Sequence, residues 1–82
     1  MKARVYVRLK TGVLDPQGRA IAEALHGLGF DEVADARVGK VIDLDLDLTE
    51  TDSTKAHARA TDMAAKLLVN PVIESFEIEV LG

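Results

Sequence analysis

Apolar and polar residues alternate strictly at the start of the chain, and this pattern limits the fold more than any other feature of the sequence. From Lys2 to Lys10 every second residue is apolar, and the residues between them are charged or aromatic. Successive side chains of a β-strand point to opposite faces, so a period of two predicts a half-buried strand. The pattern returns between Val72 and Leu81. The chain therefore begins and ends in strands that each have one face to cover.

The segment from Thr11 to Gly18 contains more turn-forming and helix-capping residues than the start of a helix requires. Asp15 followed by Pro16 predicts an N-cap and a first helical residue, because proline fixes φ near the helical value and its missing N–H is not needed there. Gly18 then falls inside the first turn, where it costs about 1 kcal/mol relative to alanine. This cost indicates close approach by another segment, either of the same chain or of a partner protein. The helix is predicted over 15–29.

Two more strands and a second helix are predicted in the rest of the chain. Gly39 and Lys40 separate two strand-like runs and indicate a tight hairpin or a bulge. The second helix ends at Asn70, because the following proline disfavours a helical conformation in the residue before it. These elements are strands over 32–38 and 41–48, a polar loop over 49–54 that ends in helix-capping residues, and a helix over 54–69. The helix is predicted to bury an apolar stripe formed by Ala56, Ala60, Met63, Ala64, Leu67 and Leu68.

The resulting order is β-α-β-β-α-β in a single domain over 1–82. Right-handed crossovers applied to this order favour an α+β, ferredoxin-like sandwich: a four-stranded antiparallel sheet in the order 4-1-3-2 with both helices on one face. Residues 1–41 carry a net charge of +2 and residues 42–82 one of −6. The topology explains this asymmetry, because Arg4 and Arg8 of the first strand would lie between aspartates of the third strand and glutamates of the fourth. The uncovered sheet face and the short edge strands predict a homo-oligomer.

Composition excludes several classes of function. The chain has no cysteine, which removes disulfides, thiolate metal sites and a cysteine nucleophile and fits a cytoplasmic location. A net charge of −4 argues against nucleic-acid binding, which depends on neutralising phosphates. No apolar run approaches the roughly 18 residues of a membrane span, so no membrane partner is expected.

The sequence also offers no convergent catalytic or metal-binding groups. His26 and His57 lie on different predicted helices, and neither has a second ligand at i+3 or i+4. Asp43, Asp45 and Asp47 alternate along one strand, where side chains on the same face are about 6.6–6.8 Å apart and do not converge on one ion. The loop before the first helix lacks phosphate-binding spacing. No catalytic, cofactor-binding or metal residue is therefore predicted.

Three segments together resemble the PurS family, the small accessory subunits of phosphoribosylformylglycinamidine synthase in purine biosynthesis. The resemblance runs essentially from end to end, with Phe30 at a position where the family often has tyrosine. The segments are Gly12 to Gly18 with Ala24-Leu25 and Leu28 to Phe30, then Arg37 to Lys40, and then Leu67 to Glu74.

This resemblance implies a subunit of an ATP- and glutamine-dependent ligase with no active site of its own. The family bridges a glutaminase subunit and a synthetase subunit as a homodimer or tetramer and supports ammonia transfer between them. No cofactor would be bound by this chain, and ATP, Mg and glutamine would bind to the other subunits. The implied partner contacts are Gly12, Leu14, Asp15, Pro16, Gln17, Gly18, Arg37, Gly39, Lys40, Asn70, Pro71 and Glu74.

An alternative function is open for the same fold. An ACT-like dimeric regulatory domain also has the ferredoxin-like arrangement and binds a small ligand such as an amino acid. Such domains are usually attached to an enzyme, whereas the 82 residues here form one unit.

Overall fold

The central strand of the sheet is the first one in the sequence. The computed structural model describes residues 1–47 and 52–81. Strand β1 (Lys2–Leu9) pairs on one side with β2 (Gly39–Asp45) and on the other with β3 (Glu74–Leu81), antiparallel in both cases. The described residues thus form a three-stranded sheet in the order β2-β1-β3. The predicted strand at each end of the chain is confirmed.

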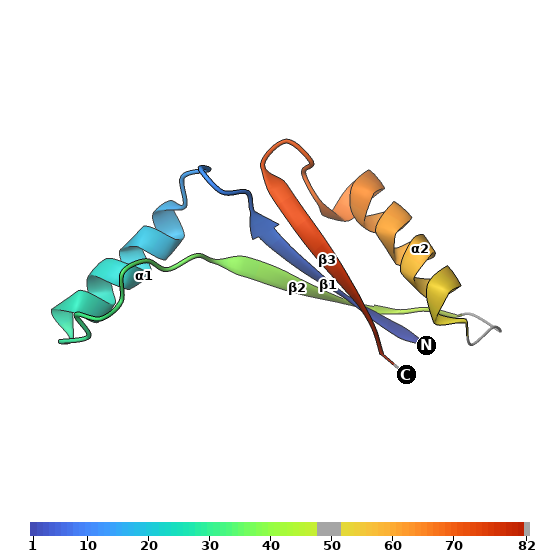
Figure 1. The fold of residues 1–82 in the computed structure, drawn as a ribbon, viewed down its shortest axis with the longest axis horizontal. Coiled ribbons are helices and arrows are strands. Elements are labelled where there is room, and N and C mark those ends of the chain that lie inside the picture. Colours follow the sequence, from blue (N-terminus) through green and yellow to red (C-terminus); the bar gives the residue numbers. More distant parts are fainter. Residues whose placement is uncertain (48–51, 82) are drawn as a thin grey trace.

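One helix covers one face of this sheet. Helix α2 (Ser53–Met63) continues into a π-helical turn, η1 (Ala64–Leu68), and lies against β1 and β3 (Figure 1). Ala56, Ala60 and Ala64 are fully buried at a spacing of four residues, and their small side chains let the helix approach the strands closely. Ala64 belongs to one core cluster with Val5, Val7 and Val69, against which the partly buried side chains of Ile42, Leu44, Leu68, Phe76 and Ile78 pack.

The π-helical turn changes which residues of the second helix face the core. The N–H of Val69 donates to the carbonyl of Ala64 at 3.0 Å, five residues back instead of four. This wider turn takes Leu67 off the apolar stripe, and its side chain is 84% exposed. The sequence pattern had placed Leu67 on the buried face, which is wrong for this side chain.

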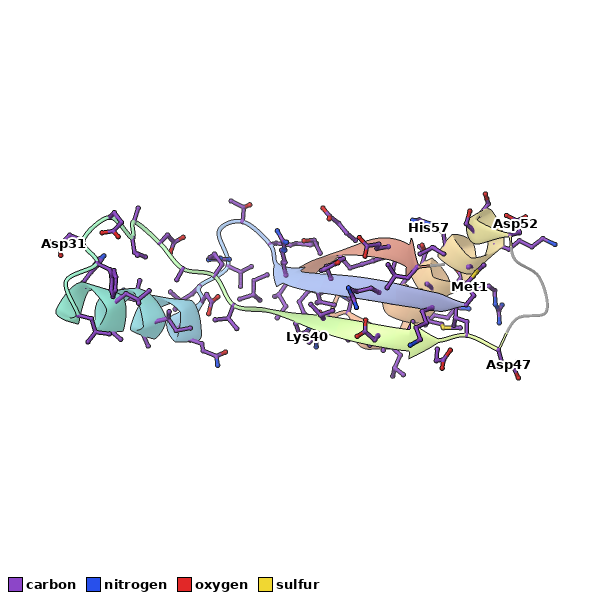
Figure 2. The ribbon with its side chains drawn as sticks, turned by 90° about the horizontal axis from the view of Figure 1, so that it is seen from below. Met1, Asp31, Lys40, Asp47, Asp52 and His57 are labelled. Atoms are coloured by element: carbon purple, nitrogen blue, oxygen red, sulfur yellow. The ribbon has the colours of Figure 1, made fainter. Side chains whose placement is uncertain are left out.

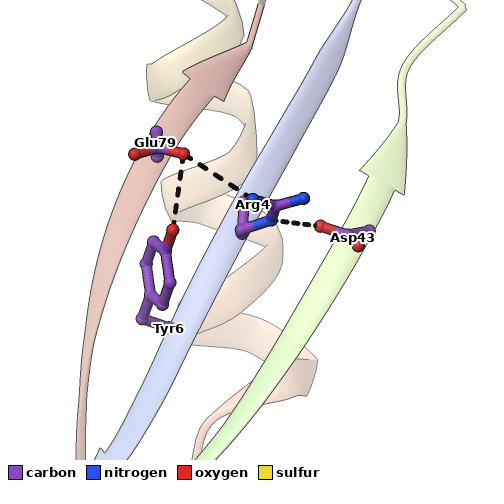
Figure 3. Close-up of polar contacts among 4 residues, drawn as sticks. All are labelled: Arg4, Tyr6, Asp43 and Glu79. Carbon is purple, nitrogen blue, oxygen red and sulfur yellow. Dashed lines mark hydrogen bonds and ion pairs between the residues drawn. The ribbon is translucent and has the colours of Figure 1, made fainter.

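Charged residues on the other face of the sheet pair across the strands (Figure 3). The Arg4 guanidinium on β1 lies 2.7 Å from Asp43 of β2 and 4.0 Å from Glu79 of β3. The Tyr6 hydroxyl donates to the same Glu79 carboxylate at 3.4 Å. Exposed pairs of this kind contribute about 0–1 kcal/mol each to stability. They therefore specify the strand register more than they stabilise the fold. The predicted position between acidic neighbours is confirmed for Arg4 and is wrong for Arg8, which the register places between Gly39 and Ser75.

The first helix lies away from the sheet. Helix α1 (Pro16–Gly27) projects beyond the end of the strands, and the chain returns along it to the start of β2 (Figure 1). Figure 2 shows Asp31 at the outer tip of this arm, with Lys40 on the part of the sheet nearest to it. The radius of gyration is 16.3 Å, against about 12 Å for a compact chain of this length. The prediction that both helices cover one face of the sheet is therefore wrong for the single chain.

The predicted strand over 32–38 is absent from the part of the chain that the structure describes. Residues 33–38 belong to no strand, and Gly39 and Lys40 begin β2 instead of forming a hairpin. Gly39 pairs with Arg8, and a Cβ added to it would lie 2.6 Å from the carbonyl oxygen of Val7. The glycine thus permits a close approach of two strands, not a turn. The α+β class is confirmed, whereas the four-stranded 4-1-3-2 sheet is wrong for this chain.

Two predictions fall partly outside the described residues. Residues 49–51 of the polar loop over 49–54 and the last residue of the predicted strand 41–48 lie there. Asp52, at the end of that loop, is described, and its carboxylate accepts a hydrogen bond from the Thr54 N–H at 2.9 Å. The expected cap of the second helix is therefore present.

Candidate partner-binding site

Parts of the three segments that carry the family resemblance meet at one end of the sheet. In the strand register, Arg8 lies opposite Gly39 and Leu9 lies opposite Glu74. The end of β1 is therefore flanked by the start of β2 and the start of β3. The loop that leaves β1 leads directly to α1. We call this region, residues 10–18, 35–40 and 70–74, the junction.

Lys10 connects all three parts of the junction. Its N–H donates to the carbonyl of Ile73 at 2.8 Å, and its Nζ donates to the carbonyl of Pro71 at 2.6 Å. Its own carbonyl accepts from the Val13 N–H at 3.1 Å and from Nη2 of Arg37 at 3.2 Å. The sequence pattern gave Lys10 only as the last outward residue of a strand. Its connecting role depends on contacts between distant segments, for which the sequence carries no signal.

The Asp15 carboxylate fixes the start of α1 to the returning chain. Oδ1 accepts from the Gly18 N–H at 2.8 Å, which confirms the predicted N-cap, and Oδ2 accepts from the Val38 N–H at 2.8 Å. Asp15 is only 7% exposed. The backbone N–H groups of Val38 and Gly18 hold the pKa of this carboxyl below its ordinary value. Both oxygens of the Asp15 carboxylate therefore accept hydrogen bonds from the chain's own backbone.

Gly18 is buried by the same returning segment. A Cβ added to it would lie 2.1 Å from the carbonyl oxygen of Ala36, a backbone atom that cannot rotate away. Close packing within the chain, one of the two explanations that the sequence left open, therefore accounts for this glycine. A partner contact at Gly18 stays a prediction.

Asn70 and Glu74 close the turn before β3. The Asn70 N–H donates to the Glu74 side chain at 2.8 Å, and the Glu74 N–H donates to the Asn70 carbonyl at 2.8 Å. The Asn70 amide oxygen also accepts from the Val72 N–H at 3.1 Å. These two predicted contact residues thus hold the shape of the turn on which Pro71 is exposed.

The remaining predicted contacts present their side chains or backbone to the surface of the junction. Leu14 is 74% exposed, and Gly12 has a φ of +90° that favours glycine. Val72, within the segment Leu67 to Glu74 of the resemblance, is also on this surface and is 79% exposed. The other exposed members are Pro16, Gln17, Arg37, Gly39 and Lys40.

The described residues show no arrangement typical of an active site. His26 lies on α1, where Nε2 contacts the carbonyl of Val33, and His57 lies on α2 beside Thr61. Over 1–47 and 52–81, no three metal-ligating side chains gather in one place. In the same ranges no helix has the length and apolar character needed to cross a membrane.

The sequence model of the PurS family, described as phosphoribosylformylglycinamidine (FGAM) synthase, matches residues 2–82. The chain belongs to the PurS family. It is 43% identical over 79 residues to the phosphoribosylformylglycinamidine synthase subunit PurS of Bacillus subtilis, covering 96% of this chain and 90% of that one. It is 44% identical over 77 residues to the PurS subunit of Mycobacterium leprae, covering 94% and 91% of the two chains.

Solved structures of PurS proteins share the arrangement. PurS of Methanocaldococcus jannaschii, described as a subunit of formylglycinamide ribonucleotide amidotransferase, superposes with a TM-score of 0.83 at 42% identity, covering 95% of this chain and 92% of that chain. A chain in the structure of PurLQS from Thermotoga maritima superposes with a TM-score of 0.84 at 31% identity, covering 98% and 95%. The elongated shape with a projecting helix thus fits the shape of its relatives.

We expect Gly18→Ala to destabilise the fold by about 1–3 kcal/mol, because the new methyl group forces the Ala36 carbonyl aside. Gly27→Ala is the matched control: it lies on the same helix, and an added Cβ there has nothing within 4 Å. Urea unfolding of the two variants and the wild type measures the difference. Equal stability of both variants would show that Ala36 does not press on Gly18, and loss of assembly alone would then favour a partner contact.

The second prediction concerns acid stability. The pKa of Asp15 is lower in the folded chain than in the unfolded chain, so its ionised form stabilises the fold above the ordinary value of 3.8. This contribution disappears as pH falls through the lower folded-state pKa. Asp15→Asn should reduce the melting temperature at neutral pH and bring it closer to that of the wild type in acid. Asp31→Asn, at the tip of the arm, should leave the dependence of the melting temperature on pH unchanged. An equal loss of melting temperature in both variants would contradict the stabilising role assigned to Asp15.

Proposed function

We propose that this chain is the non-catalytic small subunit of phosphoribosylformylglycinamidine synthase in de novo purine biosynthesis. The observation that carries the proposal is the PurS match over residues 2–82, supported by the likeness to a chain of the Thermotoga maritima PurLQS structure. The junction supports a docking role, because its predicted contact residues are held rigidly by the chain's own hydrogen bonds while part of its surface stays exposed.

In this proposal the chain bridges two catalytic subunits. A glutaminase subunit releases ammonia from glutamine, and an ATP-dependent synthetase subunit uses it to form the amidine. The chain holds the two together in the cytoplasm and supports the transfer of ammonia. ATP, Mg and glutamine bind to the other subunits, and the chain itself binds no cofactor.

The proposal includes a homodimer, or a tetramer built from it. Helix α1 and the residue that caps it carry an apolar stripe that the rest of the chain does not cover: Ile21 on the helix is 44% exposed, and Leu28 at its C-cap is 74% exposed. Phe30, just beyond the helix, is 48% exposed. Full burial of one large apolar side chain contributes about 1.5–3 kcal/mol. A second copy of the chain that covers this stripe would thus gain several kcal/mol toward association.

An ACT-like regulatory domain is not favoured. The PurS family model accounts for the chain from residue 2 to residue 82, which leaves no segment that needs a second explanation.

Replacing both Ile21 and Leu28 by glutamate should produce monomers, because two charges would then lie in the proposed contact between copies. Sedimentation velocity of the wild type and the variant measures the assembly state. Ala20→Glu is the control, since Ala20 is exposed on the same helix outside the stripe. A double variant that sediments like the wild type would rule out α1 as the contact.

The bridging role is tested by reconstitution. The chain, the glutaminase subunit and the synthetase subunit should elute together when glutamine and a magnesium nucleotide are present. Leaving the chain out should abolish glutamine-dependent turnover while ammonia-dependent turnover by the synthetase remains. Undiminished glutamine-dependent turnover without the chain would overturn the proposal.

A further inference from the structure

The segment between α1 and β2 alternates like a strand, although no strand of the described chain pairs with it. Residues 33–38 belong to no strand, and they lead directly into β2 (Figure 1). From residue 35 to residue 47 every odd-numbered residue is exposed, whereas the half-buried residues are all even-numbered: Ala36, Val38, Ile42, Leu44 and Leu46. Burial with a period of two is typical of one continuous strand. The alternation of β2 therefore extends back through the unpaired segment.

One edge of β2 is open. The Leu46 N–H donates to the Met1 carbonyl at 2.8 Å, and the Met1 amino group donates to the Leu46 carbonyl at 3.3 Å. Hydrogen-bonded pairs alternate along an antiparallel ladder, so the even-numbered residues of β2 bond to β1. The N–H and C=O groups of the odd-numbered residues point the other way, where the described sheet has no further strand. This edge thus presents a row of unpaired backbone groups of the kind that joins another strand.

The same open edge continues along residues 33–38. The N–H of Val38, an even-numbered residue, donates to Asp15 of the same chain at 2.8 Å. The N–H groups of Asp35 and Arg37 have no acceptor among the described residues, and the alternation directs them to the side of the unpaired groups of β2. An unpaired segment of six residues and the open edge of the seven-residue strand β2 therefore lie in line.

Two open stretches of nearly equal length on one edge fit a second copy of this chain. A two-fold axis perpendicular to the sheet near Gly39 lays residues 33–38 of each copy antiparallel to β2 of the other. Such an axis keeps each face of the sheet on its own side, so even-numbered residues of one copy lie opposite even-numbered residues of the other. Each copy then donates one stretch and accepts the other, and neither stretch stays unpaired.

The attachment of α1 supports the same occupant. The first turn of α1 is fastened to residues 33–38 through Asp15 and Gly18, so pairing of this segment would carry the helix onto the other copy. Helix α2 lies against β1 and β3, and Ile42 and Leu44 of β2 stay half-buried. The apolar stripe of α1 and these two side chains of the other copy would then cover each other.

We propose that two copies of this chain join into one continuous sheet through this edge, each supplying residues 33–38 as a strand beside β2 of the other. The proposal rests on the proposed homodimer and names the surface through which it forms. The strand pattern over 32–38 then has in the second copy the neighbour that the single chain lacks.

Proline at two neighbouring positions tests the pairing. Asp35→Pro removes an N–H that points to the open edge, whereas Ala34→Pro removes one that points away from it, and neither N–H has an acceptor in the described chain. The two-fold contact loses two hydrogen bonds in the first variant, so sedimentation equilibrium should show its dimer Kd raised at least about tenfold. Ala34→Pro and Asp35→Ala, which keeps the N–H, should dimerise like the wild type. An equal Kd in Asp35→Pro and either control would overturn the proposal.

Spin labels measure the pairing while every backbone N–H of the edge remains. The chain has no cysteine, so Val41→Cys and Asp45→Cys each place one label per copy at an exposed position of β2. Around a two-fold axis near Gly39, each step along the strand lengthens the distance between equivalent residues by about 6.6 Å. Double electron–electron resonance should therefore give a distance about 26 Å longer for the label at 45 than for the label at 41. An equal or shorter distance at 45 would contradict the pairing.

The outcomes separate this proposal from those on which it rests. If the wild type sediments as a monomer, the homodimer fails together with the pairing. If the wild type is a dimer and Asp35→Pro dimerises equally well, only the pairing fails. If the labels show the pairing but the two catalytic subunits do not elute with the chain, the bridging role fails and the pairing stands. If Asp35→Pro stays a dimer and loses only the catalytic subunits, a segment of one of them occupies the edge, and the second copy is overturned as its occupant.

Discussion

The pairing of β1 with both neighbouring strands is the constraint on which the rest of the structure depends. Its register sets Arg4 between two carboxylates and sets Arg8 between Gly39 and Ser75, which supply none. It also brings the starts of β2 and β3 to the end of β1, where Lys10 bonds to both sides. The charge balance of the outer face and the junction are therefore consequences of one strand register.

Local patterns predicted the elements that depend on local interactions. Alternation predicted β1 and β3, and Asp15 followed by Pro16 predicted the start of α1 to the residue. The charge distribution predicted the position of Arg4 between acidic strands. In the candidate site, the family resemblance selected segments that the fold does bring together. Each of these signals lies within a few residues or in a regular repeat, which is why a single sequence suffices to detect it.

The errors arose where one residue type serves two physical purposes. A glycine permits a tight turn or a close approach of two chains, and the sequence does not distinguish them. Gly39 was taken as a turn, yet it lets β2 pass close to the carbonyl of Val7. That choice made residues 32–38 a fourth strand and placed α1 over the sheet. Likewise, nothing in the stripe of the second helix signals the π-helical turn that turns Leu67 outward.

The position of α1 follows from the contacts of Asp15 and Gly18. The carboxylate of Asp15 bonds to Val38, and Gly18 lies under the Ala36 carbonyl, so the helix is fastened to the segment that returns to the sheet. This attachment holds the arm beyond the end of the strands and leaves its apolar stripe without cover from the same chain. A compact monomer would need to break the Asp15 bonds to fold the helix back. Association with another chain, as proposed above, would cover the stripe while those bonds remain.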